Sequence, residues 1–179
     1  MTRLQVAVIG SAGPEEYRFN TPCVDMYAAA EQIGIKLAEQ NCIVINGGKG
    51  GIMEAVSRGA QSRGGMTVAE VSGNQRGVAN KYVDVEVVTG DSSFRGPSQL
   101  IGMSDVVISL GGGAGTLQEL AVAYRMQKPV VLLVGYGGWT DSLSTLRYLD
   151  ERELVKFVAV KSVDMAVQKA LKLVQLEIT

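Results

Sequence analysis

Short runs of aliphatic and β-branched residues alternate with longer segments of helical periodicity along the whole chain. Most of these runs are continuously apolar, which is typical of strands that helices cover on both faces of a parallel sheet. The repeated order of strand and helix predicts an α/β fold with a doubly wound, mainly parallel sheet of about seven strands and helices on both faces. We place the strands at residues 4–9, 42–46, 66–71, 82–88, 106–110, 130–134 and 156–160.

Helices are expected between these strands. The first begins near Thr21 and Pro22, where an N-cap residue precedes a proline suited to the first helical position. Because the chain has 179 residues and shows no linker or internal repeat, we expect one nucleotide- or phosphate-binding domain over residues 1–179. The other helices are expected at residues 50–63, 97–103, 116–126, 142–149 and from 162 onward.

Composition excludes several classes of chemistry. The chain has no histidine, which rules out catalytic triads, general bases and metal sites that depend on one. Cys23 and Cys42 form no CxxC motif, so no protein-bound zinc is expected. A net charge of −1 argues against nucleic acid or a membrane as partner. The 46% of hydrophobic residues and a strand-like first segment without signal-peptide features predict a cytoplasmic homo-dimer or homo-tetramer.

Three strand-to-helix turns are rich in glycine: "VIGSAGPEEY", "VINGGKGGIMEA" and "ISLGGGAGTLQEL". In doubly wound sheets, ligands bind beyond the carboxyl ends of the strands, where these turns lie. Glycine lets the backbone approach a ligand closely, and the free N–H groups of a helix N-terminus attract a phosphate. The alternative is that the glycines only make tight turns and close packing. We favour a phosphorylated small molecule, bound by Gly10, Ser11, Gly47, Gly48, Lys49, Gly50, Gly51, Gly111, Gly112, Gly113, Ala114, Gly115 and Thr116.

The glycine turns do not match the fingerprints of common nucleotide cofactors. No GxGxxG unit is complete, because Met53 stands where the third glycine belongs. Lys49 is followed by glycine rather than by serine or threonine, so the Walker pattern is absent as well. NAD-dependent chemistry and Walker-type NTPase chemistry are therefore disfavoured.

Glu119 has two interpretations. With Thr116 it completes a capping box, in which each side chain satisfies a backbone donor at the start of the helix. Alternatively, Glu119 is a reagent one turn into the helix that holds the ligand, and Glu54 stands similarly in the earlier turn. Two carboxylates that face one sugar would suit cleavage of a glycosidic bond.

Three polar residues in other loops are further candidates. Arg76 follows the third predicted strand, and Arg95 and Ser98 follow the fourth, so all three lie on the edge of the sheet where ligands bind. Their guanidinium and hydroxyl groups either bind phosphate or carboxylate, or remain solvated and cap the short helix.

The motifs "GGKGGIMEAVSRGA" and "SLGGGAGTLQEL" together resemble the LOG-like superfamily of Rossmann proteins, often labelled lysine decarboxylases, over roughly residues 4–173. The resemblance implies a Rossmann-like fold, a role for Met53 in the first motif and a phosphate-binding turn that ends at Thr116. The phosphoribohydrolases of this superfamily cleave the N-glycosidic bond of nucleoside 5′-monophosphates and, in plants, release cytokinins. Glu119 matches their catalytic glutamate. They need no metal or cofactor, and nothing in these turns marks a pyridoxal phosphate site.

The chain departs from the phosphoribohydrolases before the second motif. Their MHxRK segment is replaced by "SSFRGPSQLIGMSD", in which Arg95 falls about one position from the family arginine, and Gly111 replaces a proline. The same departures resemble a branch that includes the molybdenum cofactor carrier proteins. That branch implies that residues 111–116 bind the phosphate of the molybdenum cofactor, with Arg95, Ser98 and residues 47–51 around the rest, and that molybdoenzymes are partners. Two functions stay open: a carrier or binding protein, which we favour, and a phosphoribohydrolase that uses Glu119 and Arg95.

Overall fold

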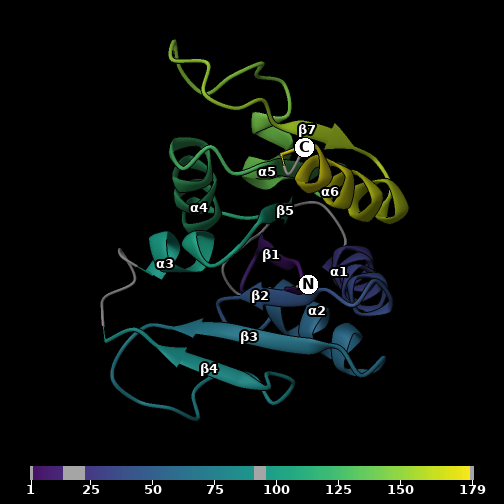
Figure 1. Cartoon of the computed structure of the whole chain (residues 1–179), viewed down its shortest axis with the longest axis vertical. Helices are drawn as coiled ribbons and strands as arrows, with labels where there is room; N and C mark the ends of the chain where they lie inside the picture. Colours follow the sequence, from purple (N-terminus) through teal and green to yellow (C-terminus); the bar gives the residue numbers. More distant parts are fainter. Residues whose placement is uncertain (1, 14–22, 91–95, 178–179) are drawn as a thin grey trace.

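One parallel sheet forms the centre of the molecule (Figure 1). The computed structural model describes residues 2–13, 23–90 and 96–177. Neighbouring strands all pair in parallel in the order β4-β3-β2-β1-β5-β6-β7, which confirms the predicted doubly wound sheet. The seven strands of the described residues are β1 (Gln5–Gly10), β2 (Ile43–Asn46), β3 (Met66–Val71), β4 (Val85–Val88), β5 (Val106–Leu110), β6 (Val130–Leu133) and β7 (Val158–Val160).

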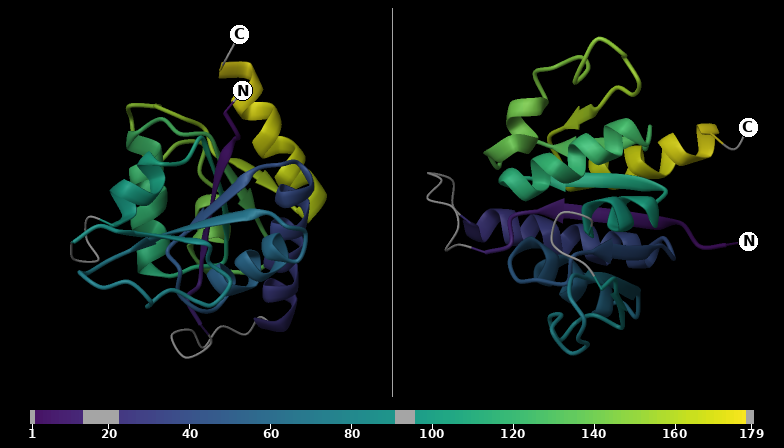
Figure 2. Two further views of the ribbon diagram at one scale, coloured as in Figure 1. Left: turned by 60° about the horizontal axis from the view of Figure 1, so that its bottom comes forward. Right: turned by 90° about the vertical axis from the view of Figure 1, so that its left-hand side faces the viewer.

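Helices cover both faces of the sheet (Figures 1 and 2). The six helices of the described residues are α1 (Cys23–Glu39), α2 (Ile52–Gln61), α3 (Gly96–Gly102), α4 (Ala114–Arg125), α5 (Gly138–Leu143) and α6 (Val163–Glu177). One face packs against α1, α2 and α6, and the other packs against α3, α4 and α5. No helix in the described part of the chain combines the length and apolar character needed to cross a membrane.

The central strands are apolar throughout because both of their faces are buried. In β1, Val6 and Val8 belong to the core on the α1 side, while Ala7 and Ile9 belong to the core on the α4 side. Side chains alternate between the faces of a strand, so a strand covered on both sides needs apolar residues at every position. This is the physical basis of the pattern that predicted the strands.

Helices α1 and α2 touch backbone to backbone at two glycines. A Cβ atom on Gly34 would collide with the carbonyl oxygen of Val56, and one on Gly59 would collide with that of Glu31. The Arg58 guanidinium forms two hydrogen bonds, of 3.1 and 2.9 Å, with the carboxylate of Glu31 beside this contact. The close approach fixes α2 against α1, and with it the glycine turn from which α2 begins.

Two helices begin earlier than their sequence pattern predicts. Helix α4 begins at Ala114 instead of residue 116, and α5 spans Gly138–Leu143 instead of residues 142–149. Both follow a glycine N-cap, Gly113 or Gly137, which has no side chain to mark the start of a helix. In α5 the carboxylate of Asp141 also accepts hydrogen bonds of 3.0 Å from the N–H of Gly135, which ties the preceding turn to the helix.

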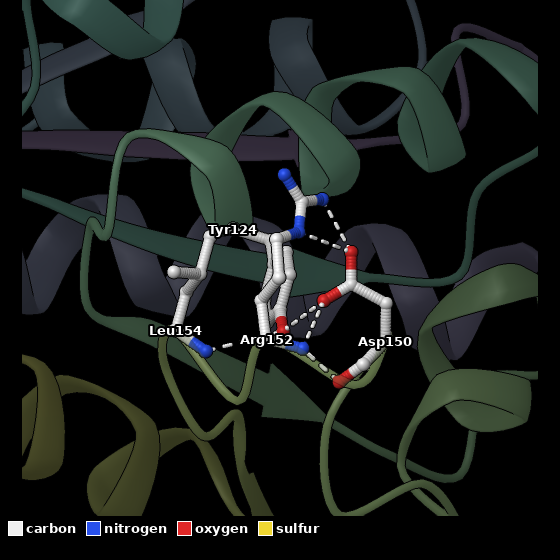
Figure 3. A network of polar contacts seen from close by, with 4 residues as sticks. All are labelled: Tyr124, Asp150, Arg152 and Leu154. Carbon is white, nitrogen blue, oxygen red and sulfur yellow. Dashed lines mark hydrogen bonds and ion pairs between the residues drawn. The ribbon is translucent and has the colours of Figure 1, made fainter.

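The helix predicted at residues 142–149 does not continue beyond Leu143, and a polar network holds residues 150–154 against α4 (Figure 3). The hydroxyl of Tyr124 on α4 donates to the Asp150 carboxylate at 2.8 Å and accepts a hydrogen bond from the Leu154 N–H at 3.1 Å. Arg152 pairs with the same carboxylate. The Arg152 guanidinium, helped by the Tyr124 hydroxyl, lowers the pKa of Asp150 to about 2.

Candidate functional site

The sheet changes its winding direction between β1 and β5. These strands run side by side as far as Gly10 and Leu110, and the chain then continues from β1 toward β2 on one side and from β5 toward β6 on the other. Doubly wound sheets hold their ligands at this point, beyond the carboxyl ends of the strands. A cavity of about 270 Å³ lies there, lined by residues from the turns after β1 and β2 and from β3, α3 and α4.

The first two glycines after β5 serve the fold. Gly111 and Gly112 have φ angles of +62° and +92°, in the left-handed region that favours glycine. Their carbonyl oxygens accept hydrogen bonds from the N–H groups of Thr140 and Trp139 in α5. The N–H of Gly112 donates to the hydroxyl of Ser11 at 3.2 Å, which joins the turns after β1 and β5. These contacts make the turn a rigid support for α4, and neither glycine lines the cavity.

Helix α4 presents its first turn to the cavity. Its N-cap residue, Gly113, has an extended φ of −103° and makes no side-chain hydrogen bond to the helix. The N–H groups at the start of a helix have no partner within it and attract anions. Gly115 and Thr116 line the cavity. A Cβ atom on Gly115 would meet no described atom within 4 Å, so the fold does not require glycine there.

The capping interpretation of Thr116 and Glu119 is wrong. A capping box needs its threonine at the N-cap, but the N-cap is Gly113, which places Thr116 inside the first turn and Glu119 in the second. The Thr116 side chain is buried against Gly112. Glu119 lines the cavity instead.

Two asparagines shape the turn between β2 and α2. The side-chain oxygen of Asn46 accepts a hydrogen bond of 2.8 Å from the Gly48 N–H. The Asn80 side chain donates to the carbonyl oxygens of Gly48 and Lys49, at 3.1 and 2.9 Å. The turn is thereby fixed on both sides. It contributes a glycine, an exposed cation and a thioether to the lining of the cavity: Gly47, Lys49 and Met53.

Glu70 is a second carboxylate in the cavity, and the sequence motifs did not identify it. It lies in β3, is only 5% exposed, and accepts a hydrogen bond of 2.8 Å from the Thr89 hydroxyl through Oε1. Glu54, which the sequence pattern pairs with Glu119, does not line the cavity. The sequence does contain a signal for Glu70, which is a charged residue inside the apolar strand "MTVAEV". Burial of a charge costs free energy unless the charge has a partner, so such a residue is a candidate for ligand binding.

The surroundings of Glu119 keep its carboxyl group protonated at neutral pH. Burial raises the pKa of Glu119 to about 8; the nearby positive charge of Lys49 opposes this rise, and the negative charge of Glu70 adds to it. The cavity therefore holds a protonated carboxyl group close to the side chain of Glu70. Such a pair can donate a proton to one atom of a ligand and accept hydrogen bonds from others.

Several predicted contacts lie away from the cavity. Arg76 is exposed in the loop after β3, and Ser98 is exposed on α3, and neither lines the cavity. Arg95 lies outside the described residues. Of the predicted glycine-turn residues, those that do not line the cavity are Ser11, Gly48, Gly50, Gly51, Gly111, Gly112, Gly113 and Ala114. Across the described chain, no group of three or more His, Cys, Asp or Glu side chains could hold a metal ion.

Known proteins share this architecture. The X-ray structure of TM1055 is 35% identical and superposes with a TM-score of 0.86, over 94% of this chain and 99% of that chain. The molybdenum cofactor carrier protein of Chlamydomonas reinhardtii is 26% identical with a TM-score of 0.78, over 98% of this chain and 99% of that chain.

A curated relative from rice and a family model extend the comparison. A probable cytokinin riboside 5′-monophosphate phosphoribohydrolase of Oryza sativa subsp. japonica is 32% identical over 139 residues, which cover 73% of this chain and 55% of the rice protein. The matched region thus spans about half the length of that relative. These similarities confirm the resemblance to LOG-like Rossmann proteins. Because the model of the SLOG cluster4 family matches residues 3–167, the chain belongs to that family.

Proposed function

We propose that this protein binds a phosphorylated heterocyclic ligand in the cavity at the carboxyl ends of β1, β2 and β3, with the phosphate on the first turn of α4. The observation that carries the proposal is Gly115. Glycine in a helix costs about 1 kcal/mol relative to alanine, and neither φ nor a close neighbour requires glycine here. The missing side chain leaves open space beside N–H groups that no side chain caps. A ligand that approaches the backbone explains this choice of residue.

The charges and the size of the site indicate the class of ligand. The N–H groups of α4 and the cation of Lys49 suit a phosphate, while Glu70 and Glu119 suit the polar edge of a ring. A volume of about 270 Å³ is slightly below the usual range for small-molecule pockets, roughly 300–1,000 Å³, so part of a larger ligand would remain at the surface.

The molybdenum cofactor is the first ligand to test, because it combines a pterin ring with a phosphate. The similarity to the Chlamydomonas carrier protein, over nearly the full length of both chains, supports this choice. In this proposal the protein is a carrier, and the cofactor is its cargo rather than a catalytic group.

Two measurements test the binding proposal. Native mass spectrometry of the purified protein should detect a bound phosphorylated compound, and titration with isolated molybdenum cofactor should give saturable binding. GMP should bind and guanosine should bind at least tenfold more weakly, because only GMP can use the first turn of α4. Equal binding of GMP and guanosine would contradict a phosphate site on α4, and absence of binding to both and to the cofactor would end the proposal.

A second candidate function is hydrolysis of nucleoside 5′-monophosphates, and the protonated Glu119 favours it. A carboxyl group with a pKa of about 8 still holds its proton at neutral pH. It could donate that proton to the ring nitrogen of the leaving base while the N-glycosidic bond breaks; water then adds to the sugar carbon and gives its proton back to the Glu119 carboxylate. The similarity to the rice phosphoribohydrolase supports this candidate.

Base release distinguishes the enzyme from the carrier. The protein would be incubated with AMP, GMP, CMP and a cytokinin monophosphate, and free base and ribose 5-phosphate would be measured. If it is a hydrolase, Glu119→Gln should abolish turnover and retain ligand binding, because glutamine fills the same space and cannot transfer the proton. No product from any of the four nucleotides would exclude this function for these substrates.

A further inference from the structure

Glu70 brings to the cavity a carboxylate oxygen that receives no hydrogen bond from the described residues. The residue lines the cavity and is 5% exposed, and its Oε1 is bonded to the Thr89 hydroxyl. No side chain or backbone N–H of the described residues donates to its Oε2. Glu70 is little exposed yet lines the cavity, so a ligand there could supply Oε2 with the donors that the described residues do not.

The fold holds this carboxylate in place from two sides. Thr89, which follows β4, bonds it on one side and also reaches the Val71 carbonyl oxygen at 3.3 Å. Gly96 at the start of α3 lies against it on the other, since a Cβ atom there would stand 2.7 Å from Oε2 and 3.0 Å from Oε1. Any side chain at position 96 would displace the carboxylate. Because Glu70 lines the cavity, a hydrogen-bond donor of a ligand can reach it from there.

We propose that Glu70 recognises the ring of the ligand by accepting hydrogen bonds from an amino group and an adjacent ring N–H. This inference rests on the proposed function, because it takes a phosphorylated heterocycle as the ligand. Carboxylates bind such paired donors with both oxygens, and the charge strengthens each bond. Guanine and pterin carry an amino group, a ring N–H and a carbonyl oxygen in a row. Hypoxanthine lacks the amino group, and adenine lacks the ring N–H.

Glu119 complements Glu70 in this recognition. Its protonated carboxyl group can donate to the ring carbonyl that lies next to the paired N–H groups of guanine and pterin. Lys49 is the charged group of the lining that would face the phosphate rather than the ring. The site thus selects for a ring with an acceptor beside two donors, and it disfavours rings that present only one of these groups.

Calorimetric titration of the full chain with GMP, IMP, AMP and ribose 5-phosphate tests the assignment. The wild-type protein should bind GMP about tenfold or more tightly than IMP, the effect of one hydrogen bond to a charged group. Glu70→Gln should reduce GMP affinity to the level of IMP and leave ribose 5-phosphate binding unchanged. The matched control is Glu54→Gln, which removes a carboxylate that does not line the cavity and should leave all four affinities unchanged.

The possible results separate this inference from the binding function itself. Equal affinity of the wild-type protein for GMP, IMP and AMP would overturn ring recognition and leave phosphate binding intact. Selective GMP binding that persists in Glu70→Gln would overturn the role of Glu70. Failure of all four compounds to bind would overturn the role of Glu70, and the binding proposal falls with it only if the molybdenum cofactor does not bind either. The selectivity of the wild-type protein needs no variant, so the test also holds if Glu70→Gln does not fold, which circular dichroism would reveal.

Discussion

Gly115 and Gly102 are helical glycines with open space at the position of a Cβ atom, and they form a matched pair. Alanine is favoured over glycine in helices, so Gly115→Ala and Gly102→Ala should each raise the free energy of unfolding by up to about 1 kcal/mol. Only Gly115 lines the cavity. Gly115→Ala should therefore weaken GMP binding by about tenfold, because its methyl group would stand beside the N–H groups that receive the phosphate.

Urea unfolding and GMP titration of both variants measure the two effects separately. Gly102→Ala controls for the helix effect, since it should add stability without changing affinity. A Gly115→Ala protein that gained stability and bound GMP as well as the wild type would show that the ligand does not need this glycine.

At the scale of elements, the contact of α1 with α2 depends on the absence of two side chains. Gly59→Ala would push a methyl group into the backbone carbonyl of Glu31. Overpacking of this kind costs about 1–3 kcal/mol, and here the obstacle is backbone, so we expect Gly59→Ala to lower the free energy of unfolding by about 2 kcal/mol despite its better helix propensity. Urea unfolding checks this, with Gly102→Ala as the control. A stability equal to or above wild type would mean that the helices can separate at little cost.

Strands could be predicted where burial on both faces requires apolar residues. The starts of two helices could not, because a glycine N-cap has no side chain that marks them in the sequence. Strands such as β1 and β5 were predicted because burial on both faces demands an unbroken apolar run. The start of α4 was misplaced because its N-cap is a glycine, whereas Thr116, which resembles a cap, lies inside the helix. The start of α5 was misplaced for the same reason at Gly137.

The same distinction applies to the site. The glycine turns after β2 and β5 indicated where a ligand would bind, because turn and strand positions follow from sequence order. Glu70 was missed because it belongs to no motif. Its importance comes from the position of β3 relative to α3 and α4, and that juxtaposition joins residues far apart in the chain. The sequence instead pairs Glu54 with Glu119, because Glu54 stands next to a glycine turn. Glu54 does not line the cavity.

For the whole molecule, Asp150 and Glu119 change the free energy of unfolding in opposite directions as pH rises. The pKa of Asp150 falls from its ordinary value of 3.8 to about 2, so the unfolded state binds more protons in that range and stability decreases as pH falls from about 4 to about 2. Arg58 likewise lowers the pKa of Glu31. The pKa of Glu119 rises from 4.5 to about 8, so the folded state binds more protons and stability decreases as pH rises through this interval. We expect the free energy of unfolding to be greatest near about pH 4–5, measured by urea unfolding from pH 2.5 to 8.5.

Glu119→Gln isolates the upper part of this profile. Glutamine keeps the size of the side chain and cannot ionise, so the variant should gain stability relative to wild type as pH rises from about 4.5 to about 8, by at most about 5 kcal/mol at about 1.36 kcal/mol per pKa unit. Arg152→Gln should flatten only the acid part. A constant difference between Glu119→Gln and wild type at every pH would show that Glu119 ionises normally in the folded protein. The expected result would mean that the protonated Glu119 lowers the stability of the protein at neutral pH. A destabilising group of this kind is typical of a binding site rather than of a structural core.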